Sequence, residues 1–218
     1  MDHASRNRLT DRQFDRFPGE TLFARIARAV CHAGCLPRKE LYEAWEVARR
    51  VRRRFRGGRV VDLACGHGLL SSILLLLDDS SPRALGIDRA LPESAARLQA
   101  VLEDAWPRLR GRVELRCGEI EAVELTADDL VVSVHACGGL TDRVVDLALA
   151  ARARLAVLPC CHDLASGDCG DLRGWLDGPL AMDVTRATRL RAAGYRLVTQ
   201  TIPAEITPKN RLLLAEPG

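Results

Sequence analysis

The residues best suited to chemistry lie in two short stretches in the second half of the sequence. Residues 135–138 read HACG, and residues 159–162 read PCCH. A histidine exchanges protons near neutral pH, so His135 and His162 are candidate general bases. A cysteine thiolate is a nucleophile, so Cys160 is a candidate for covalent attack on an acceptor. The alternative for Cys160 is a small side chain packed beneath a pocket, and the sequence leaves both interpretations open.

Cysteine also binds metals, and the sequence contains eight cysteines. A zinc site could in principle be built from five residues, namely Cys31, Cys35, Cys160, Cys161 and His162. A Cys-x-x-x-Cys spacing and an adjacent pair are both poor matches to zinc-finger spacing. We therefore expect no bound metal, and we expect reduced thiols in a cytosolic protein.

Small and acidic residues form a second candidate site, earlier in the sequence. Residues 62–68 read DLACGHG, and Gly66 and Gly68 in this stretch follow residues that are typical of a strand. Glycines allow the backbone to turn sharply beside a ligand, and a helix that begins there presents free N–H groups. Asp88 and Glu119 stand at the ends of the next two predicted strands, where an acid can accept hydrogen bonds from ribose hydroxyls or reach a nucleobase. Each feature alone also has a structural explanation, as a tight turn, a helix cap or a solvated acid.

The elements that must position these residues alternate between strand and helix. Strands are predicted at 59–64, 84–87, 113–117, 130–134 and 155–158, and helices at 68–77, 92–105 and 141–151. A helix at 183–193 is followed by strands at 195–202 and 211–215. This order predicts an α/β fold, a Rossmann-like doubly wound seven-stranded sheet that is mostly parallel with an antiparallel hairpin at its C-terminal edge. Ligands of such sheets bind at the carboxyl ends of the strands, where both candidate sites lie.

Residues 1–58 are predicted to form an N-terminal arm and helical cap, and residues 59–218 the sheet domain. Residues 1–19 are polar and end in a Pro-Gly pair, so we expect a frayed or loosely docked arm there. Apolar residues at helical spacing predict one helix at 20–33 and a second that begins after Pro37. The second helix could close over an acceptor bound to the sheet domain.

Composition and charge limit the partners of the protein. The chain has 218 residues, of which 47% are hydrophobic, enough for one sizeable core. No apolar run is long enough to cross a bilayer and no secretory leader is apparent, so we expect a cytoplasmic protein without a membrane partner. Residues 1–58 contain 14 Lys and Arg against 7 Asp and Glu, whereas residues 59–218 contain 18 against 22. This basic N-terminal region is compatible with contacts to RNA phosphates, although the arginine run at 49–54 is also explained as the solvated end of a helix.

The sheet portion of the sequence, about residues 59–215, resembles class I S-adenosylmethionine-dependent methyltransferases. That family's first motif, acid-x-Gly-x-Gly-x-Gly, is matched by Asp62, Ala64, Gly66 and Gly68. Ala64 replaces the first glycine of the motif, which fits if its backbone φ is negative. The resemblance implies that S-adenosyl-L-methionine is the cofactor, that Asp88 holds its ribose and that Glu119 lies beside its adenine.

The sequence also resembles a narrower branch of these methyltransferases, which includes the eukaryotic tRNA acceptor-stem 2′-O-methyltransferase and the methyltransferase domain of the glutathione S-transferase C-terminal-domain-containing protein. The branch patterns His-x-Cys-Gly-x-x-Thr-Asp and Cys-Cys-His are matched by His135, Cys137, Gly138, Thr141, Asp142, Cys160, Cys161 and His162. Lys39 and Glu43 resemble the charged residues of a helix that precedes the domain in this branch. On this basis the catalytic candidates are His135, Cys160 and His162. The acceptor-binding candidates are Lys39, Glu43, Cys137, Gly138, Thr141, Asp142 and Cys161.

The acceptor and the oligomeric state are not determined by the sequence. RNA, and tRNA in particular, is favoured by the resemblance, with protein and small-molecule acceptors still open. Many RNA 2′-O-methyltransferases use two lysines in the core, and only Lys209 lies there, so a 2′-O reaction would need a base such as His135 or His162. One alternative is a non-catalytic binding module with the same fold. An NAD-dependent enzyme is less favoured, because Ser71 stands where the dinucleotide motif needs glycine or alanine and no second domain follows.

Overall fold

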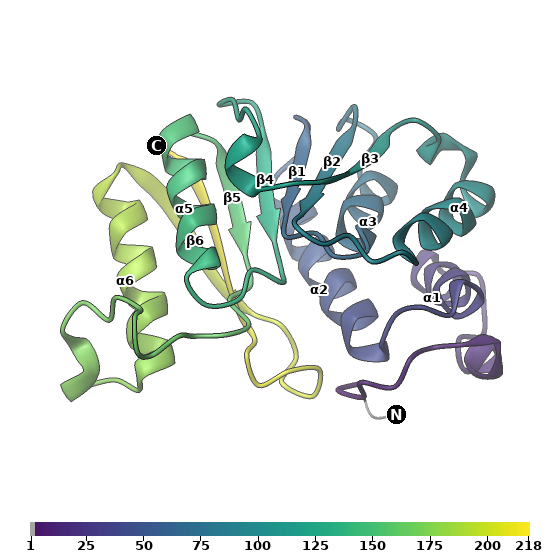
Figure 1. Ribbon diagram of the computed structural model, residues 1–218, viewed down its shortest axis with the longest axis horizontal. Coiled ribbons are helices and arrows are strands. Elements are labelled where there is room, and N and C mark those ends of the chain that lie inside the picture. The colour runs from purple at the N-terminus through teal and green to yellow at the C-terminus, as the bar shows by residue number, and fades with distance from the viewer. Residues whose placement is uncertain (1–2) are drawn as a thin grey trace.

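The computed structural model describes residues 3–218, which form a seven-stranded sheet with helices on both faces (Figure 1). The strands are β1 (Val60–Leu63), β2 (Ala84–Asp88), β3 (Val113–Cys117), β4 (Leu130–Ser133), β5 (Arg154–Val157), β6 (Tyr195–Thr201) and β7 (Arg211–Pro217). The α-helices are α1 (Leu22–Ala33), α2 (Arg38–Arg54), α3 (Leu69–Leu77), α4 (Ala95–Ala105), α5 (Leu140–Ala151) and α6 (Gly178–Ala192). Short 3₁₀ helices are η1 (Asp11–Arg16), η2 (Pro107–Leu109), η3 (Ile120–Ala122) and η4 (Leu172–Gly174).

The strand order is β3-β2-β1-β4-β5-β7-β6. Strands β1 to β5 are parallel to one another, whereas β7 is antiparallel to both β5 and β6. A parallel neighbour needs a crossover helix, and β6 and β7 have none between them, so they pair as a hairpin. The predicted fold class, including its antiparallel C-terminal edge, is confirmed.

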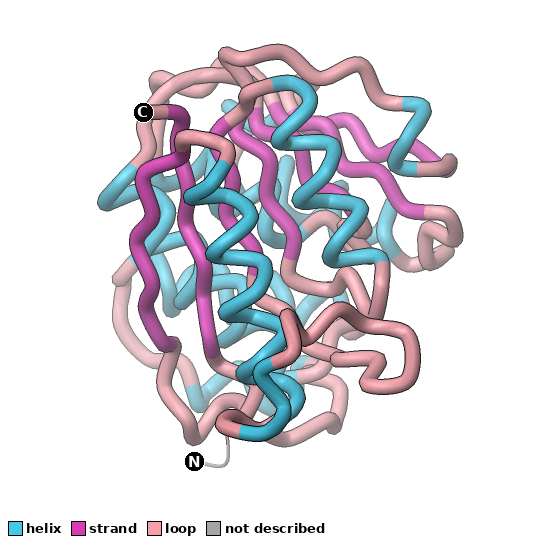
Figure 2. Tube along the Cα trace, turned by 90° about the vertical axis from the view of Figure 1, so that its left-hand side faces the viewer, coloured by secondary structure: helices cyan, strands magenta, loops and turns pink. Residues whose placement is uncertain are grey.

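The two faces of the sheet bury different clusters of apolar residues. Val60 and Val132 join the core beneath α1 to α4, and the alternating Val61 and Val131 join the core beneath α5 and α6. Figure 2 views the molecule from the side of α6 and shows helices on both sides of the strands. Both faces of the central strands β1 and β4 are therefore covered, which explains why these two strands are buried along their whole length, whereas the edge strand β3 alternates apolar and charged residues.

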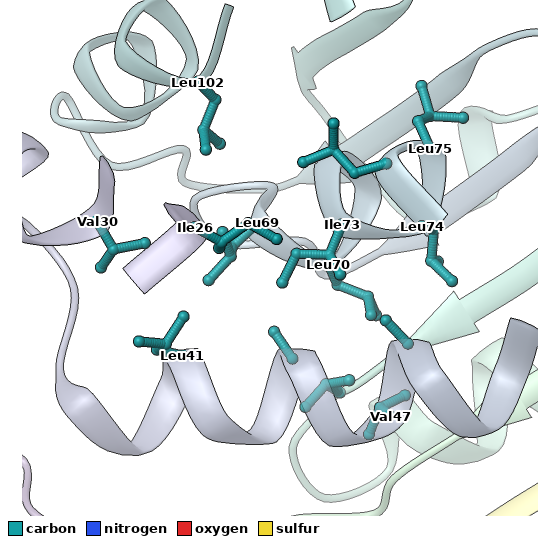
Figure 3. Close-up of a cluster of buried hydrophobic side chains, with 14 of the residues drawn as sticks. Ile26, Val30, Leu41, Val47, Leu69, Leu70, Ile73, Leu74, Leu75 and Leu102 are labelled. Carbon is teal, nitrogen blue, oxygen red and sulfur yellow. The ribbon is translucent and has the colours of Figure 1, made fainter. Parts of the chain in front are cut away.

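Helices α1 and α2 belong to the larger of these cores. Their side chains, among them Ile26, Val30, Leu41 and Val47, point toward Leu69 to Leu75 of α3 and toward Leu102 of α4 (Figure 3). Because one continuous cluster contains side chains from both parts of the chain, the helical cap is packed into the same core as the sheet.

The N-terminal arm is ordered against the body of the protein, and the expectation of a frayed or loosely docked arm is wrong. Leu9 and Phe17 are only 1% and 4% exposed. The Leu9 N–H donates to the Leu36 carbonyl at 2.8 Å, and the Arg28 guanidinium donates to the Phe17 carbonyl at 2.7 Å. Two apolar side chains in an otherwise polar stretch are sufficient to fix it to α1.

The other predicted elements agree with the structure within a few residues, except that α6 begins five residues before its predicted start. Asp177 caps this helix by accepting the Leu180 N–H at 2.9 Å, and Pro179 follows in its first turn. Within residues 3–218, no helix has the length and apolar character that crossing a membrane requires.

Candidate active site

The loop between β1 and α3 turns through three residues of left-handed backbone. Ala64, Gly66 and Gly68 have φ angles of 60°, 53° and 71°. A Cβ added at Gly68 would lie 2.5 Å from Cδ2 of Leu115, so a larger residue does not fit. The condition under which alanine fits the motif, a negative φ at Ala64, is not met, because the loop makes a left-handed turn there and the alanine adopts it at a steric cost.

Asp88 at the end of β2 is tied to this loop. Its Oδ2 accepts the Gly66 N–H at 2.9 Å, and its Oδ1 accepts the Ala90 N–H at 3.0 Å. A Cβ added at Gly66 would meet no atom within 4 Å, so there is open space beside the loop. Each oxygen of the half-buried Asp88 keeps a further lone pair for a ligand in that space.

Asp62 lies beneath the loop at the end of β1 and is 2% exposed. The Ser71 hydroxyl donates to its Oδ2 at 3.0 Å. Burial, with a smaller contribution from the nearby charge of Asp88, raises the pKa of the Asp62 carboxyl to about 7. No cation among residues 3–218 pairs with this carboxyl, so it is suited to a positively charged group of a ligand.

Glu119 follows β3 and is more exposed than the other acids of the site. It forms an ion pair with Arg89, with 3.0 Å between Nε and Oε1. Asp88 is the register partner of Cys117 on β3, so Glu119 stands two residues beyond the tip of the neighbouring strand. The structure therefore gathers Asp62, Gly66 and Asp88 closely and leaves Glu119 at the rim.

His135 follows β4 and faces a small cavity of about 20 Å³, whose lining includes Glu40, Asp62 and His67. This volume is about that of one water molecule. The ring of His135 makes no hydrogen bond with any residue between 3 and 218. Burial and the positive charge of Lys39 lower its pKa to about 4, so the ring is neutral at neutral pH and can accept a hydrogen bond.

The N-terminal turns of α2 cover this part of the site. Lys39 Nζ forms an ion pair with the buried Glu43 Oε1 at 2.7 Å. Burial raises the pKa of Glu43, although Lys39 and the nearby Thr207 side chain act to lower it. The structure therefore brings Lys39 and Glu43 close to His135 and joins α2 to the loop between β6 and β7.

Three cysteine thiols meet where the loops after β4 and β5 lie side by side. The sulfur atoms of Cys137 and Cys160 are 3.4 Å apart, and those of Cys137, Cys160 and Cys161 all lie within 4.8 Å of one another. Cys31 and Cys35 lie apart from this cluster, in the core around α1. The sequence analysis grouped Cys31 and Cys35 with the adjacent pair and missed Cys137, because the conformation of two loops decides which thiols meet.

The three thiols differ in how readily they ionise. A hydrogen bond from Cys137 lowers the pKa of the Cys161 thiol, and the charges of Lys209 and Lys39 lower it further. Burial raises the pKa of Cys160 well above its ordinary value. The geometry therefore favours Cys161 as the thiolate of the group, and it does not favour Cys160 as a nucleophile.

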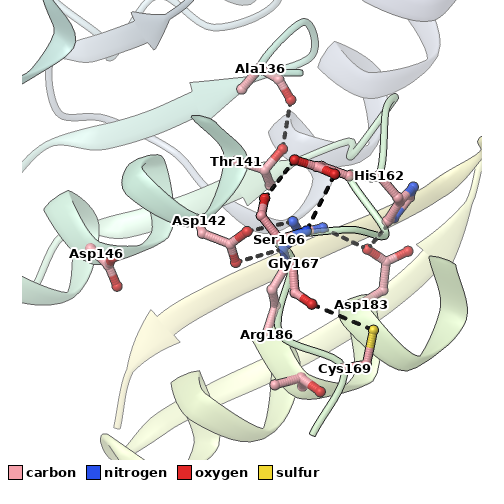
Figure 4. A network of polar contacts seen from close by, with 12 residues as sticks. Ala136, Thr141, Asp142, Asp146, His162, Ser166, Gly167, Cys169, Asp183 and Arg186 are labelled. Atoms are coloured by element: carbon pink, nitrogen blue, oxygen red, sulfur yellow. Dashed lines mark hydrogen bonds and ion pairs between the residues drawn. The ribbon is translucent and has the colours of Figure 1, made fainter. Parts of the chain in front are cut away.

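His162 is held in a buried network of charges between the β5 loop and α6 (Figure 4). Its Nε2 lies 2.8 Å from Oδ1 of Asp183, and Arg211 donates to Oδ2 of the same carboxylate at 2.6 Å. Arg186, which is 1% exposed, donates to both oxygens of Asp142 at 2.9 and 2.7 Å. These contacts hold the loop after β5 against α5 and α6, and the His162 side chain is 3% exposed.

The remaining members of the branch pattern hold the loop after β4. The Thr141 hydroxyl donates to the Ala136 carbonyl at 2.6 Å, and the Gly138 N–H donates to the Cys161 carbonyl at 3.0 Å. Gly138 has a φ of 59°, so its glycine suits a left-handed turn. Sequence reasoning missed Asp183, Arg186 and Arg211, because nothing in the sequence distinguishes them from surface charges.

A larger cavity of about 530 Å³ opens between α6 and the β6–β7 pair. Asp183, Arg186 and Arg211 line it, together with apolar side chains such as Leu180 and Leu213. None of the predicted site residues lines this cavity, and no residue of the loop between β1 and α3 (residues 64–68, the glycine loop) lines it. It adjoins the loop after β5, because Pro159 and the His162 partner Asp183 belong to its lining.

Most arginines of the run at 49–54 are paired within the chain. Arg49 and Arg50 pair with Glu46, the buried Arg52 pairs with Asp78, and Arg54 pairs with Glu216. These partners neutralise most of the run, which supports the structural explanation of its charge. Arg6, Arg8, Arg12 and Arg16 are exposed, and no ion pair joins them to another residue between 3 and 218.

Comparison with protein families gives one match. Residues 39–167 match a family described as a methyltransferase domain. The matched range extends from α2 through the glycine loop and both stretches of histidine and cysteine. A comparison with curated proteins gives no match.

Three solved structures illustrate the similarity of fold. TrmK, the tRNA m1A22 methyltransferase of B. subtilis, is 16% identical with a TM-score of 0.52, over 81% of this chain and 65% of that one. An O-methyltransferase family protein from Burkholderia thailandensis is 20% identical with a TM-score of 0.56, over 94% of this chain and 63% of that one. The methyltransferase domain of bacterial CtHen1-C is 19% identical with a TM-score of 0.57, over 83% of this chain and 99% of that one. The chain spans just under two thirds of the first two proteins, and identities this low show the fold alone.

Proposed function

We propose that RNA is the methyl acceptor of this chain, which belongs to the methyltransferase-domain family and is a class I S-adenosylmethionine-dependent methyltransferase. Among RNAs, tRNA is the favoured acceptor. The acceptor enters over the loops that follow β4 and β5, beneath the N-terminal turns of α2. The family does not favour the two alternatives, a non-catalytic module and a nicotinamide-dependent enzyme.

The main support for the cofactor assignment is the hydrogen bond that joins Asp88 to the glycine loop. The Gly66 N–H fixes the Asp88 carboxylate at the edge of open space, where its free lone pairs can accept the two ribose hydroxyls. Asp62 provides a buried negative charge for the amino group of the methionine part. Glu119 stands at the rim on the adenine side. The residues present therefore fit the cofactor in hydrogen bonding and in charge.

When bound, the cofactor supplies a methyl group on a positively charged sulfur, which an acceptor atom displaces in line. The residues of this chain align that atom and exclude water, which can provide much of the rate enhancement. The neutral ring of His135 accepts a hydrogen bond from an acceptor hydroxyl or amine. With a pKa of about 4 it is a weak base, so we assign it to orienting the acceptor. Lys39 and Glu43 close the site from α2.

Support for an RNA acceptor comes from charge and from fold. The exposed arginines of the arm, Arg6, Arg8, Arg12 and Arg16, carry positive charge that no ion pair within residues 3–218 neutralises. Arginines of this kind bind phosphate oxygens and steer a polyanion toward the molecule. TrmK, whose fold is similar, is a tRNA methyltransferase. The arm leads into the helices that cover the site, so a bound RNA would meet both.

The cofactor assignment is tested by calorimetric titration with S-adenosylhomocysteine, with NADH as the control ligand. We expect micromolar binding of the first and none of the second. Asp88→Ala should weaken the binding at least about tenfold, because the ribose loses a charged acceptor. Asp104→Ala removes an exposed acid of α4 and serves as the matched control. Equal affinity in the Asp88→Ala variant and the wild type would contradict the ribose assignment.

The acceptor is tested separately with S-adenosylmethionine that carries a tritiated methyl group. We expect radioactivity in tRNA that lacks its natural modifications, and none in DNA of similar length. If S-adenosylhomocysteine binds but tRNA takes up no label, the RNA proposal fails and the cofactor assignment stands.

A further inference from the structure

The cysteine cluster is the group of reactive side chains that the proposed methyl transfer leaves unexplained. Its sulfur atoms come from two loops, Cys137 after β4 and the adjacent Cys160 and Cys161 after β5. All three lie within 4.8 Å of one another. Three thiols at this separation can bind one ion without a large movement of the backbone.

The two loops are held together by contacts that do not involve the sulfur atoms. Strands β4 and β5 are parallel neighbours, and Ser133 and Val157 at their ends are register partners. The Gly138 N–H donates to the Cys161 carbonyl, and the Thr141 hydroxyl closes the turn after Cys137. The positions of the thiols are therefore set before any ion binds, which reduces the entropy that binding must overcome.

The surroundings of the cluster suit an anionic group that remains open to solvent. Cys137 is exposed and the other two cysteines are half-buried, so an ion can reach them. The chain contains two lysines, Lys39 and Lys209, and the charges of both act on Cys161. Three thiolates and one divalent cation leave a net negative charge, which these two ammonium groups offset.

We propose that Cys137, Cys160 and Cys161 form a binding site for a thiophilic metal ion, with Zn²⁺ as its probe. Three thiolate ligands are a soft set that selects zinc over magnesium or calcium. Zinc prefers four ligands, so three protein ligands leave one coordination position for water or a further ligand, as in sites that are open to solvent. Each thiol that binds the ion releases its proton to solvent. The site does not depend on the identity of the methyl acceptor.

This proposal differs from the zinc set considered from the sequence. Cys31 and Cys35 are buried around α1, and His162 is committed to Asp183. In the proposed set of ligands, Cys137 takes the place of Cys31, Cys35 and His162. Cys137 lies 23 residues from Cys160 along the chain, and their sulfur atoms are 3.4 Å apart.

The experiment uses the full chain, reduced with a phosphine, freed of metal by a chelator and dialysed against Zn²⁺. We expect about one zinc ion per chain by mass spectrometry. With Co²⁺ in place of Zn²⁺, we expect a thiolate-to-cobalt charge-transfer band in the near ultraviolet. Cys137→Ser should lower the zinc affinity about tenfold or more, because one of three ligands is removed. Cys117→Ser is the matched control, because Cys117 is an exposed cysteine on β3 outside the cluster.

Two results would overturn the metal site. One is zinc binding of equal affinity in the Cys137→Ser variant and the wild type. The other is no zinc binding by the reduced wild type. If that protein, once exposed to air, forms a Cys137–Cys160 disulfide detected by mass spectrometry, the cluster is a redox pair instead. Circular dichroism confirms folding of each variant. Binding of S-adenosylhomocysteine to the same samples shows that the cofactor site is intact, so a failure of the metal site is distinct from a failure of the methyltransferase proposal.

Discussion

The Asp62 carboxyl is buried at the end of β1, where its charged form is costly. It is 2% exposed, and its one side-chain hydrogen-bond donor among the described residues is the Ser71 hydroxyl. Its pKa rises from 3.8 to about 7 on folding, so the folded chain holds a proton that the unfolded chain has released between these values. Its contribution to stability is therefore present below about pH 4 and is lost as the pH rises through 7.

Asp62→Asn is predicted to stabilise the protein and to weaken cofactor binding. The amide keeps an oxygen for the Ser71 hydroxyl and removes the buried charge, so we expect about 1–3 kcal/mol of added stability at about pH 8 and little gain at about pH 4. Urea denaturation at the two pH values measures this difference, and calorimetry with S-adenosylmethionine should show affinity reduced about tenfold. Asp128→Asn, at an exposed acid before β4, is the control. A loss of stability at the higher pH would contradict the burial argument.

Ala64 gives a second prediction at this scale. Its φ of 60° is a conformation that alanine rarely adopts, whereas glycine adopts it freely. Ala64→Gly should therefore stabilise the fold by about 1 kcal/mol, since relief of the steric cost exceeds the loss of one methyl group. Thermal denaturation measures the change. A decrease in stability would mean that the Ala64 methyl group, which is buried in the core beneath α5, is worth more than the strain.

A network of ion pairs joins α5 to α6. Arg186 is buried on α6 and joins Asp142 of α5 to Asp183 of its own helix. Arg186→Ala should lower the free energy of unfolding by about 3 kcal/mol, because two carboxylates lose a buried partner. Arg189→Ala removes an arginine from the next turn that is 36% exposed and also pairs with Asp142, and it should change stability by less than about 1 kcal/mol. Urea denaturation compares the two variants, and equal effects would mean that burial of the network contributes nothing.

The elements themselves could be predicted because each has a local signal. Strands β1, β2, β4 and β5 are short, mostly apolar runs, and β3 alternates apolar and charged residues. Helix α1 ends at Gly34 in a left-handed cap, and the hairpin lacks a crossover helix. The same signals placed Asp62, Gly66 and Asp88 at neighbouring strand ends. The start of α6 had signals too, in Asp177 and Pro179, but the irregular stretch before it obscured them.

The contacts that could not be predicted join side chains that are distant in sequence. The loops after β4 and β5 decide that Cys137 meets Cys160, and the packing of α6 decides that His162 meets Asp183. Apolar spacing describes the face of a helix but not the partner of a charged group on it. The positions of the candidate cofactor residues at the strand ends were therefore accessible from the sequence, whereas the contacts of His162 and Cys160 were not.

At the scale of the whole molecule, the distribution of unpaired positive charge predicts how RNA binds. The arm carries Arg12 and Arg16 exposed on η1, whereas Arg50 on α2 is paired with Glu46. The Arg12→Ala/Arg16→Ala double variant should weaken tRNA binding and lower its salt dependence by about one unit of log–log slope for each phosphate that the protein no longer neutralises. Arg50→Ala is the control with little effect. Fluorescence anisotropy at several KCl concentrations measures both, and an unchanged slope would move the RNA surface away from the arm.

The order of the strands has a consequence for how the protein is assembled during synthesis. Strand β7 follows β6 in the chain but lies between β5 and β6 in the sheet. A ribosome therefore releases β6 before its one sheet partner exists, and the loop between the two strands cannot bring Thr207 to Glu43 until β7 has paired with β5. The glycine loop, Asp62 and Asp88 come from residues made earlier, and the strands that pair around them are β1 to β4. The cofactor side of the site can thus form on the nascent chain, while the acceptor side waits for the last strand to emerge.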